Sequence, residues 1–276
     1  MIALAKKLLE DPTIELVVSE ITAELARENE LRKEFYKEIS DNQKAEFING
    51  KVIIHTPPTK RHIDAGQRLL HFLSKHISTF HLGFLGYEKN LIELTRNSYE
   101  PDICFFNQDK AQHFTDDHNI FPSPDFIVEI LSKKTERYDR TIKFNDYQAH
   151  NIKEYWIVNA KRKEIEQYVL KEGKYELIKK LQSGILTSEA IPGFSIETEI
   201  VFDNEKFEEE VQKETRELYR SKKVIREQET IISEKESIIS EKDGIISEQE
   251  SIISEKDKLL AEKDALINEL KKTLGK

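Results

Sequence analysis

The fold is decided by the stretch PDFIVEILS at residues 124–132. It is a short run of apolar and β-branched residues bounded by proline and serine, which is typical of a buried β-strand. An earlier stretch, YEPDICFF at residues 99–106, has the same character. Each run carries an acid, Glu129 in the first and Asp102 in the second. A carboxylate in a dry interior costs several kcal/mol unless a cation or hydrogen bonds compensate it, so the two acids need a shared explanation.

A helix expected over residues 134–150 offers a cation. Asp139, Lys143 and Tyr147 are spaced four residues apart, so they lie along one helical face. That face can look down on the ends of the two strands. Lys143 is therefore the lysine that we expect beside the two acids.

Two acids and a lysine in this arrangement predict a divalent-metal site for phosphodiester hydrolysis. Mg²⁺ is usually held by one or two carboxylates, several waters and the phosphate oxygens of the substrate. It lowers the pKa of a bound water and stabilises charge on the phosphate, while a lysine can orient the nucleophile. We expect Asp102 and Glu129 to be the metal ligands and Lys143 to be the cation beside them.

At these residues the chain resembles the PD-(D/E)XK nuclease superfamily, through Pro101-Asp102 followed by Glu129. It is more closely similar to the Uma-type restriction endonucleases, through the run PDFIVEILS … DRTIKFNDYQAHNIKEYWIVN and the earlier AEFINGKVIIHTPPTKRH. The resemblance covers roughly residues 44–200. It implies a restriction-endonuclease-like α/β fold, with a central mixed sheet flanked by helices, and DNA cleavage that depends on Mg²⁺ or Mn²⁺.

The resemblance also bears on three further positions. The superfamily pattern has a lysine two residues after the acid, where this chain has Leu131, so Lys143 is the candidate for a migrated lysine. A glutamate near Glu46 is implied to approach the metal, the alternative being an exposed charge on a strand. His62 matches a histidine of the related family and is implied to contact substrate, the alternative being a structural role. The candidate catalytic residues are thus Asp102, Glu129, Lys143, Glu46 and His62.

The 276 residues divide by composition into three parts. Residues 1–40 read as a helical extension, interrupted at Asp11-Pro12. Residues 41–202 have globular patterning and hold the nuclease-like domain, which opens with a hairpin turning at Asn49-Gly50. Residues 203–276 are nearly all charge, serine and regularly spaced isoleucine.

The C-terminal part is a heptad repeat. The residues that recur every seven positions are Val211, Leu218, Ile225, Ile232, Ile239, Ile246, Ile253, Leu260 and Ile267. A strict heptad of this length predicts a coiled coil, although adjacent apolar pairs such as Ile231-Ile232 replace the usual spacing. The predicted helix would be about 100 Å long. Because one narrow apolar stripe cannot be buried within a single helix, we expect self-association into a homo-oligomer, with a partner's helix as the alternative.

Charge and cysteine content restrict the function further. The formal net charge is −9, which argues against tight non-specific binding to DNA, but four basic residues lie near the expected site. These are Lys133, Lys134, Arg137 and Arg140, and their alternative role is a solvated helix face. The single Cys104 excludes an intramolecular disulfide. No apolar run approaches the roughly 20 residues that span a membrane, and the N-terminus lacks a signal peptide, so we expect a cytoplasmic protein.

Two functions are consistent with this sequence. The first is a metal-dependent DNA endonuclease that is oligomerised by its C-terminal helix, which Asp102, Glu129 and Lys143 favour. The second is a catalytically inactive nuclease fold that serves as a coiled-coil interaction module. Leu131 and the acidic balance favour the second.

Overall fold

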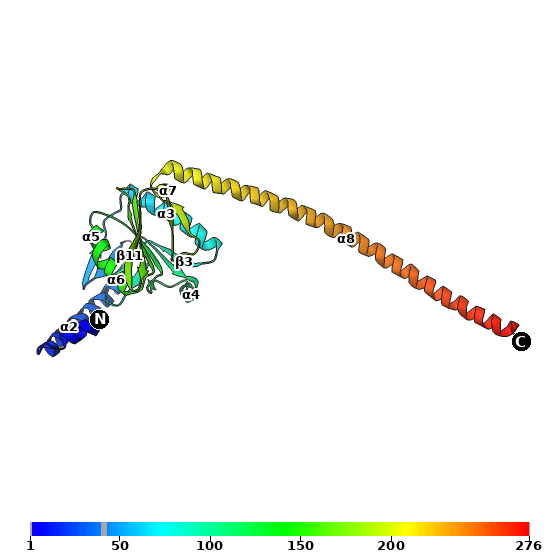
Figure 1. Ribbon diagram of the computed structural model, residues 1–276, viewed down its shortest axis with the longest axis horizontal. Coiled ribbons are helices and arrows are strands. Elements are labelled where there is room, and N and C mark those ends of the chain that lie inside the picture. Colours follow the sequence, from blue (N-terminus) through cyan, green and yellow to red (C-terminus); the bar gives the residue numbers. More distant parts are fainter. Residues whose placement is uncertain (1, 40–42, 276) are drawn as a thin grey trace. The chain divides into compact units, whose positions relative to one another are not determined.

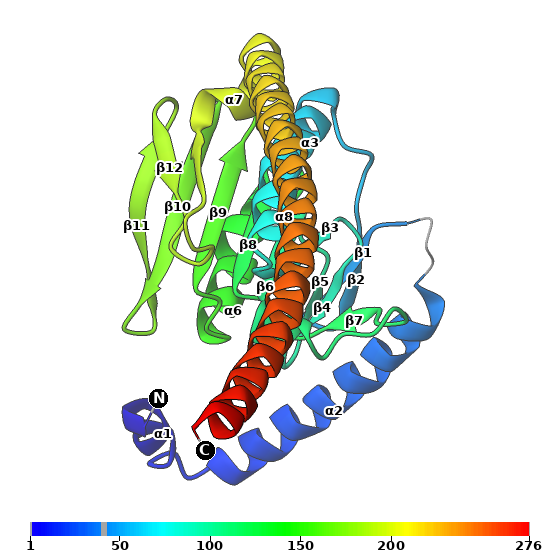
Figure 2. The ribbon, with the colours of Figure 1, turned by 90° about the vertical axis from the view of Figure 1, so that its right-hand side faces the viewer.

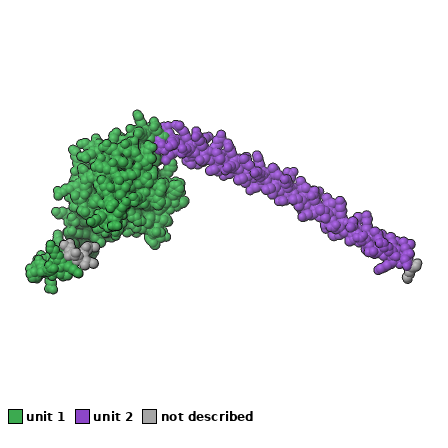
Figure 3. Space-filling view, in the orientation of Figure 1, with its two compact units in different colours: residues 1–209 green, residues 210–276 purple. Residues whose placement is uncertain are grey.

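A computed structural model of the chain describes residues 2–39 and 43–275. These residues form two compact units, residues 1–209 and residues 210–276, which are coloured separately in Figure 3. The first unit is a mixed α/β domain, and the second consists of most of one long helix. The expected fold class is confirmed.

A six-stranded mixed sheet forms the centre of the first unit (Figures 1 and 2). Its order is β11-β10-β9-β8-β6-β3, and only β8 and β9 run parallel to each other among these described strands. The bounds are β3 Gly83–Tyr87, β6 Ile103–Asn107, β8 Phe126–Ile130, β9 Glu154–Asn159, β10 Glu164–Lys171 and β11 Lys174–Leu181. The stretch at residues 124–132 thus forms a central strand, as its apolar composition predicts.

A second sheet has the order β2-β1-β5-β4-β7. Its bounds are β1 Ala45–Ile48, β2 Lys51–Ile54, β4 Leu91–Glu93, β5 Ser98–Tyr99 and β7 Ile120–Phe121, while β12 Ile185–Thr187 and β13 Ser195–Glu197 form a separate pair. The predicted hairpin is present as β1 and β2, and both Asn49 and Gly50 at its turn have positive φ. Positive φ at both positions is the requirement of the tight turn that Asn-Gly favours.

Helices cover the central sheet. The helices of the first unit are α1 Ile2–Leu8, α2 Ile14–Glu38, α3 Lys60–Thr79, α4 Gln108–Ala111, α5 Glu136–Tyr138, a π-helical turn η1 Asp139–Lys143, α6 Phe144–Ala149 and α7 Thr198–Phe202. On one face, α3 and α7 pack through Leu69, Leu73 and Val201 against the central strands. On the other face, Tyr147 of α6 and Ile92 of the second sheet pack against the same strands. The two apolar cores therefore lie on opposite faces of one sheet.

The pairing of β6 with β8 positions the two predicted metal ligands. Ile103 pairs with Val128 in this antiparallel ladder, so the next residues outward, Asp102 and Glu129, lie opposite each other. Side chains alternate between the faces of a sheet, and Ile127 belongs to the core on the face covered by α6. Asp102 and Glu129 consequently project from neighbouring strands toward that same face.

The N-terminal segment is helical, as expected, with a break at Asp11-Pro12 between α1 and α2. Its final predicted residue, Ser40, lies outside the described residues. Phe35 of α2 packs with Phe47 of β1, so the C-terminal half of α2 covers the second sheet. The N-terminal half exposes apolar side chains instead, including Leu16 and Ile21.

The long helix α8 runs from Asn204 to Leu274. Its first residues belong to the first unit, where the Phe207 ring meets the rings of His71 and Phe72 edge to face. Beyond these residues the paired isoleucines of the heptads are exposed, as Ile232 and Ile239 illustrate. No helix within the described residues is long and apolar enough to span a membrane.

Two truncations test where the folded domain ends. A chain that stops after Glu209 keeps Phe207, and we expect it to unfold cooperatively near the melting temperature of the full chain. A chain that stops after Phe202 loses the ring contacts of Phe207 and a hydrogen bond from Arg68 to Asn204, so its melting temperature should fall by several degrees. Differential scanning calorimetry of both chains makes the comparison, and equal melting temperatures would contradict it.

Candidate functional site

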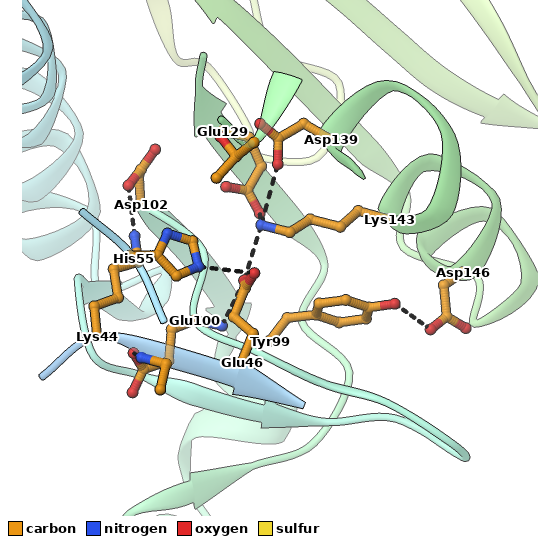
Figure 4. A network of polar contacts seen from close by, with 12 residues as sticks. Lys44, Glu46, His55, Tyr99, Glu100, Asp102, Glu129, Asp139, Lys143 and Asp146 are labelled. Atoms are coloured by element: carbon orange, nitrogen blue, oxygen red, sulfur yellow. Dashed lines mark hydrogen bonds and ion pairs between the residues drawn. The ribbon is translucent and has the colours of Figure 1, made fainter. Parts of the chain in front are cut away.

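A buried lysine lies at the centre of the site. Lys143 Nζ is 2.8 Å from Glu46 Oε1, 2.9 Å from Glu129 Oε1 and 3.2 Å from Asp139 Oδ1. Its side chain is 1% exposed. Figure 4 shows the three carboxylates, each from a different element, converging on this one ammonium. We name these four residues the lysine cluster.

Local backbone structure explains how the cluster forms. Asp139 and Lys143 begin and end the π-helical turn η1, and both side chains are buried. Such turns occur mostly as single interruptions of α-helices, often at functional sites. One turn later, the Tyr147 hydroxyl donates a 2.8 Å hydrogen bond to Glu129 Oε1. The predicted face of Asp139, Lys143 and Tyr147 is therefore present and directed at the end of β8.

Three carboxylates around one ammonium cannot all be fully compensated. Although burial opposes it, Lys143 and His55 lower the pKa of Glu46 to about 2. Burial and the charges of Asp139 and Asp102 raise the pKa of Glu129 to about 8, against the effect of Lys143. Burial also raises the pKa of Asp139. Glu46 is thus the ionised partner of Lys143, and Glu129 holds a proton more readily than an ordinary glutamate.

Asp102 belongs to an adjacent group of polar residues. Its Oδ2 accepts a 2.7 Å hydrogen bond from the backbone N–H of Ile130, and its Oδ1 lies 2.7 Å from Lys44 Nζ and 3.4 Å from His62 Nε2. Burial would raise the pKa of Asp102, but Lys44 and His62 hold it below its usual range. Asp102 is therefore an ionised carboxylate with a cation already beside it.

A pocket of about 1080 Å³ opens onto Asp102 and Glu129. Its wall also includes Lys44, His55 and His62. The cationic residues around it are Arg61, Lys133, Lys134, Lys161 and Arg162. The pocket therefore has two buried carboxylates, Asp102 and Glu129, on its floor and a rim that is basic overall, in which the cationic residues outnumber the acids Glu88 and Glu136.

The structure places the predicted site residues in two neighbouring groups. Lys143 meets Glu129 and Glu46, whereas Asp102 meets His62 and lies across the ladder from Glu129. Glu46 is buried in the lysine cluster, which excludes the alternative of an exposed strand charge. All five candidates thus lie in one region of the domain, although their catalytic roles stay predictions.

Sequence reasoning missed two residues of this region. Lys44 contacts Asp102, and His55 Nε2 lies 2.9 Å from Glu46 Oε2. The hairpin could have indicated both, because its Asn-Gly turn fixes a register in which residues 44 and 55 are opposite each other. Of the four basic residues expected near the site, Lys133 and Lys134 line the pocket.

Arg140 lies elsewhere than expected. Its guanidinium binds Glu136 and Glu166, with a 2.7 Å contact between Nη1 and Oε2 of Glu166. It therefore fastens the helical segment to β10 and does not face the pocket. Arg137 is exposed and is not among the residues that line the pocket, which is the arrangement of a solvated helix face.

The donors at the pocket floor fit a hard divalent cation. Glu129 lines the pocket, and none of the hydrogen bonds among residues 2–39 and 43–275 reaches its second oxygen, Oε2. Asp102 also attracts cations, and the Lys44 ammonium already lies beside its Oδ1. No group of three or more His, Cys, Asp or Glu residues suited to a metal was found in the described part of the chain. Waters and a phosphate oxygen would have to complete the shell, which is usual for Mg²⁺.

Fold and site together define a nuclease-like domain with an acidic centre, and comparison with known proteins agrees. Residues 32–199 match the family Uma2, described as "Putative restriction endonuclease". The chain belongs to this family. No curated protein matches it.

A solved structure has a similar fold. It is the crystal structure of a "putative nuclease belonging to DUF820" from Anabaena variabilis, with a TM-score of 0.54 and 17% sequence identity. The alignment covers 62% of this chain and 96% of the other. At this identity the likeness shows the fold alone.

The raised pKa of Glu129 predicts a pH dependence of stability. The folded protein keeps a proton that the unfolded chain releases near its ordinary pKa of 4.5. This stabilisation is fully present below that value and is lost as the pH rises through about 8. We expect the free energy of unfolding to decline across this window in the wild type and to decline less in Glu129→Gln, which resembles the protonated form.

Urea unfolding at a series of pH values measures this effect. Glu176→Gln, at an exposed position on β11, is the matched control and should keep the wild-type slope. An unchanged slope in Glu129→Gln would show that Glu129 does not carry the proton.

Proposed function

We propose that this protein is an endonuclease that hydrolyses phosphodiester bonds in DNA and depends on Mg²⁺ or Mn²⁺. The observation that carries the proposal is the position of Asp102 and Glu129, opposite each other at the floor of a basic-rimmed pocket. Membership of the Uma2 family supports nuclease activity in general. The metal, the DNA substrate and the residue roles are our inference.

The carboxylates would hold the metal, and the surrounding residues would orient them. A bound divalent ion would supply an activated water and stabilise charge on the phosphate. The Ile130 N–H fixes Asp102, while Lys143 and the Tyr147 hydroxyl fix Glu129. Glu129 is thus held through one oxygen, and Asp102 through both, because Lys44 donates to its other oxygen. Such preorganisation avoids a reorganisation cost during reaction.

The basic rim suits a polyanionic substrate. Arg61, Lys133, Lys161 and Arg162 are exposed, and the ion pairs found among the described residues leave all four without an acidic partner. Exposed cations of this kind neutralise backbone phosphates and give an affinity that falls with salt. The overall charge of −9 therefore does not describe the surface around the pocket.

One observation favours the inactive alternative. Both proposed metal ligands already touch a lysine, Asp102 through Lys44 and Glu129 through Lys143. A fold that had lost its metal could keep its buried acids neutralised in this way. The two functions therefore differ in whether a divalent ion binds.

Metal titration separates the two functions. Calorimetry with Mn²⁺ should show binding to the wild type that is abolished by Asp102→Asn combined with Glu129→Gln, and cleavage of supercoiled plasmid should be lost with it. Asp109→Asn combined with Glu176→Gln, at two acids that do not line the pocket, is the control and should leave both properties unchanged. Failure of the wild type to bind Mn²⁺, alone and with DNA present, would favour the inactive module.

We also propose that α8 joins copies of this chain as a coiled coil. Each residue of a helix is rotated by about 100° from the one before it. Viewed along the axis of α8, Lys235 therefore lies at an angle between those of Ile231 and Ile232, on the apolar side of the helix. Glu234 and Glu236 flank that lysine on either side. A second copy of the helix can cover the isoleucines while its acids compensate the lysines, which a partner lacking this repeat would not offer.

Substitutions on the two sides of α8 test self-association. Replacing Ile232, Ile239, Ile246 and Ile253 by glutamine should reduce the mass measured by light scattering to that of a single chain. The same replacement at the neighbouring Ser233, Ser240, Ser247 and Ser254, on the polar side, should leave the mass unchanged. Equal masses for both variants would exclude the isoleucine face as the interface.

A further inference from the structure

Two lysines contact the proposed metal ligands, Lys44 at Asp102 and Lys143 at Glu129, and they differ in whether a substrate can reach them. An ammonium group has three donors. Lys143 faces three carboxylates, at 2.8, 2.9 and 3.2 Å, and is almost fully enclosed. It is also not among the residues that line the pocket. Its ammonium is therefore enclosed by the three carboxylates and does not reach a substrate in the pocket.

Of the two lysines that contact the proposed metal ligands, Lys44 is the one that lines the pocket. Its side chain is 20% exposed, and it lines the pocket wall together with Asp102. Among the described residues, the only ion pair of this lysine is the 2.7 Å contact with Asp102 Oδ1, so two of its donors stay available.

The backbone holds Lys44 at a defined place. The His55 N–H donates a 3.0 Å hydrogen bond to the Lys44 carbonyl, which extends the β1–β2 ladder by one pair. Lys44 precedes Glu46 by two residues and so projects to the same side of this strand. The hairpin thereby delivers one residue to the lysine cluster and another to the pocket.

We propose that Lys44, and not Lys143, is the catalytic lysine of this enzyme. Lys44 would donate a hydrogen bond to a non-bridging oxygen of the phosphodiester that is attacked, and Lys143 is a positioning residue that holds Glu46 and Glu129. This inference rests on the proposed endonuclease function. It also accounts for Leu131, because a lysine that enters from the hairpin makes one on β8 unnecessary.

Charge in the pocket supports this assignment. A phosphodiester that approaches two carboxylates is repelled unless cations lie among them. Lys44 is such a cation, because its ammonium lies 2.7 Å from Asp102 Oδ1 and lines the pocket together with Asp102 and Glu129. Charge-assisted hydrogen bonds to phosphate are also among the stronger polar contacts in proteins.

Three methionine variants of the full chain test the proposal, each with three readouts. Lys44→Met and Lys143→Met change the two lysines at issue. Lys153→Met is the matched control, because Lys153 also pairs with a buried aspartate, Asp125 at 3.0 Å, but lies away from the pocket. The readouts are plasmid cleavage with Mn²⁺, the Mn²⁺ dissociation constant from calorimetry, and the melting temperature.

The expected results differ for each variant. Lys44→Met should cleave about 100-fold more slowly while its melting temperature stays near that of the wild type, and it should bind Mn²⁺ at least as tightly because a competing cation is gone. Lys143→Met should melt roughly 5–15 °C lower, because three buried carboxylates lose their cation. It should also bind Mn²⁺ more weakly, because Glu129 loses the hydrogen bond that positions it. Lys153→Met should match the wild type in cleavage and Mn²⁺ binding.

A chemical rescue distinguishes loss of the ammonium group from misfolding as the cause of slow cleavage. Lys44→Cys, treated in the folded state with 2-bromoethylamine, regains an ammonium of nearly the same reach when the thiolate displaces bromide. The other cysteine, Cys104, is buried. Cleavage should return after this treatment, and the untreated variant should stay slow.

Two results would overturn the assignment. One is wild-type cleavage by Lys44→Met. The other is a Lys143→Met protein that keeps its melting temperature and Mn²⁺ affinity but loses cleavage. A wild type that neither binds Mn²⁺ nor cleaves would overturn the proposed function itself, and this inference with it.

Discussion

The structure depends on one buried interaction, the contact of the Lys143 ammonium with three carboxylates. Taking a lysine and three acids out of water is costly, and only close mutual contact offsets the loss of hydration. Glu46 comes from the second sheet, Glu129 from the central sheet, and Asp139 from the same helical segment as Lys143. The lysine cluster therefore ties three layers of the domain together at one point. A shift of any layer would leave a charge buried without a partner.

The polar residues divide by their access to the pocket. Lys143, Glu46 and Asp139 are enclosed and act on the architecture, whereas Asp102 and Lys44 reach the pocket and can meet a ligand. Glu129 belongs to both groups, because one oxygen is held in the cluster and the residue also lines the pocket. Proximity to the acids of a nuclease-like site is thus not sufficient to make a lysine catalytic. The deciding property is whether the ammonium of the lysine reaches the pocket, as that of Lys44 does and that of Lys143 does not.

Local sequence patterns predicted the helices and strands well. The partners of individual charged side chains depend on long-range contacts, which these patterns do not contain. The central strand at 124–132 and the hairpin turning at Asn49-Gly50 follow from apolar runs and turn chemistry, which act over a few residues. The position of the Arg140 side chain could not be predicted, because it depends on an ion pair with Glu166, which lies on β10, further along the sequence. Glu46 was ambiguous for the same reason, since its burial follows from a lysine almost a hundred residues away.

The π-helical turn at Asp139–Lys143 has a consequence for how this chain can vary in length. Such a turn accommodates one residue more than an α-helical turn in the same place. Deleting a single residue there would restore a regular α-helical turn and leave the following residues in nearly the same rotation about the helix axis. Tyr147 would then stay beside the Glu129 carboxylate to which it donates. A deletion between Phe144 and Asp146, in the regular helix α6, would instead rotate Tyr147 by about 100° relative to Lys143, so the π-helical turn is the point in this segment where a change of length is best tolerated.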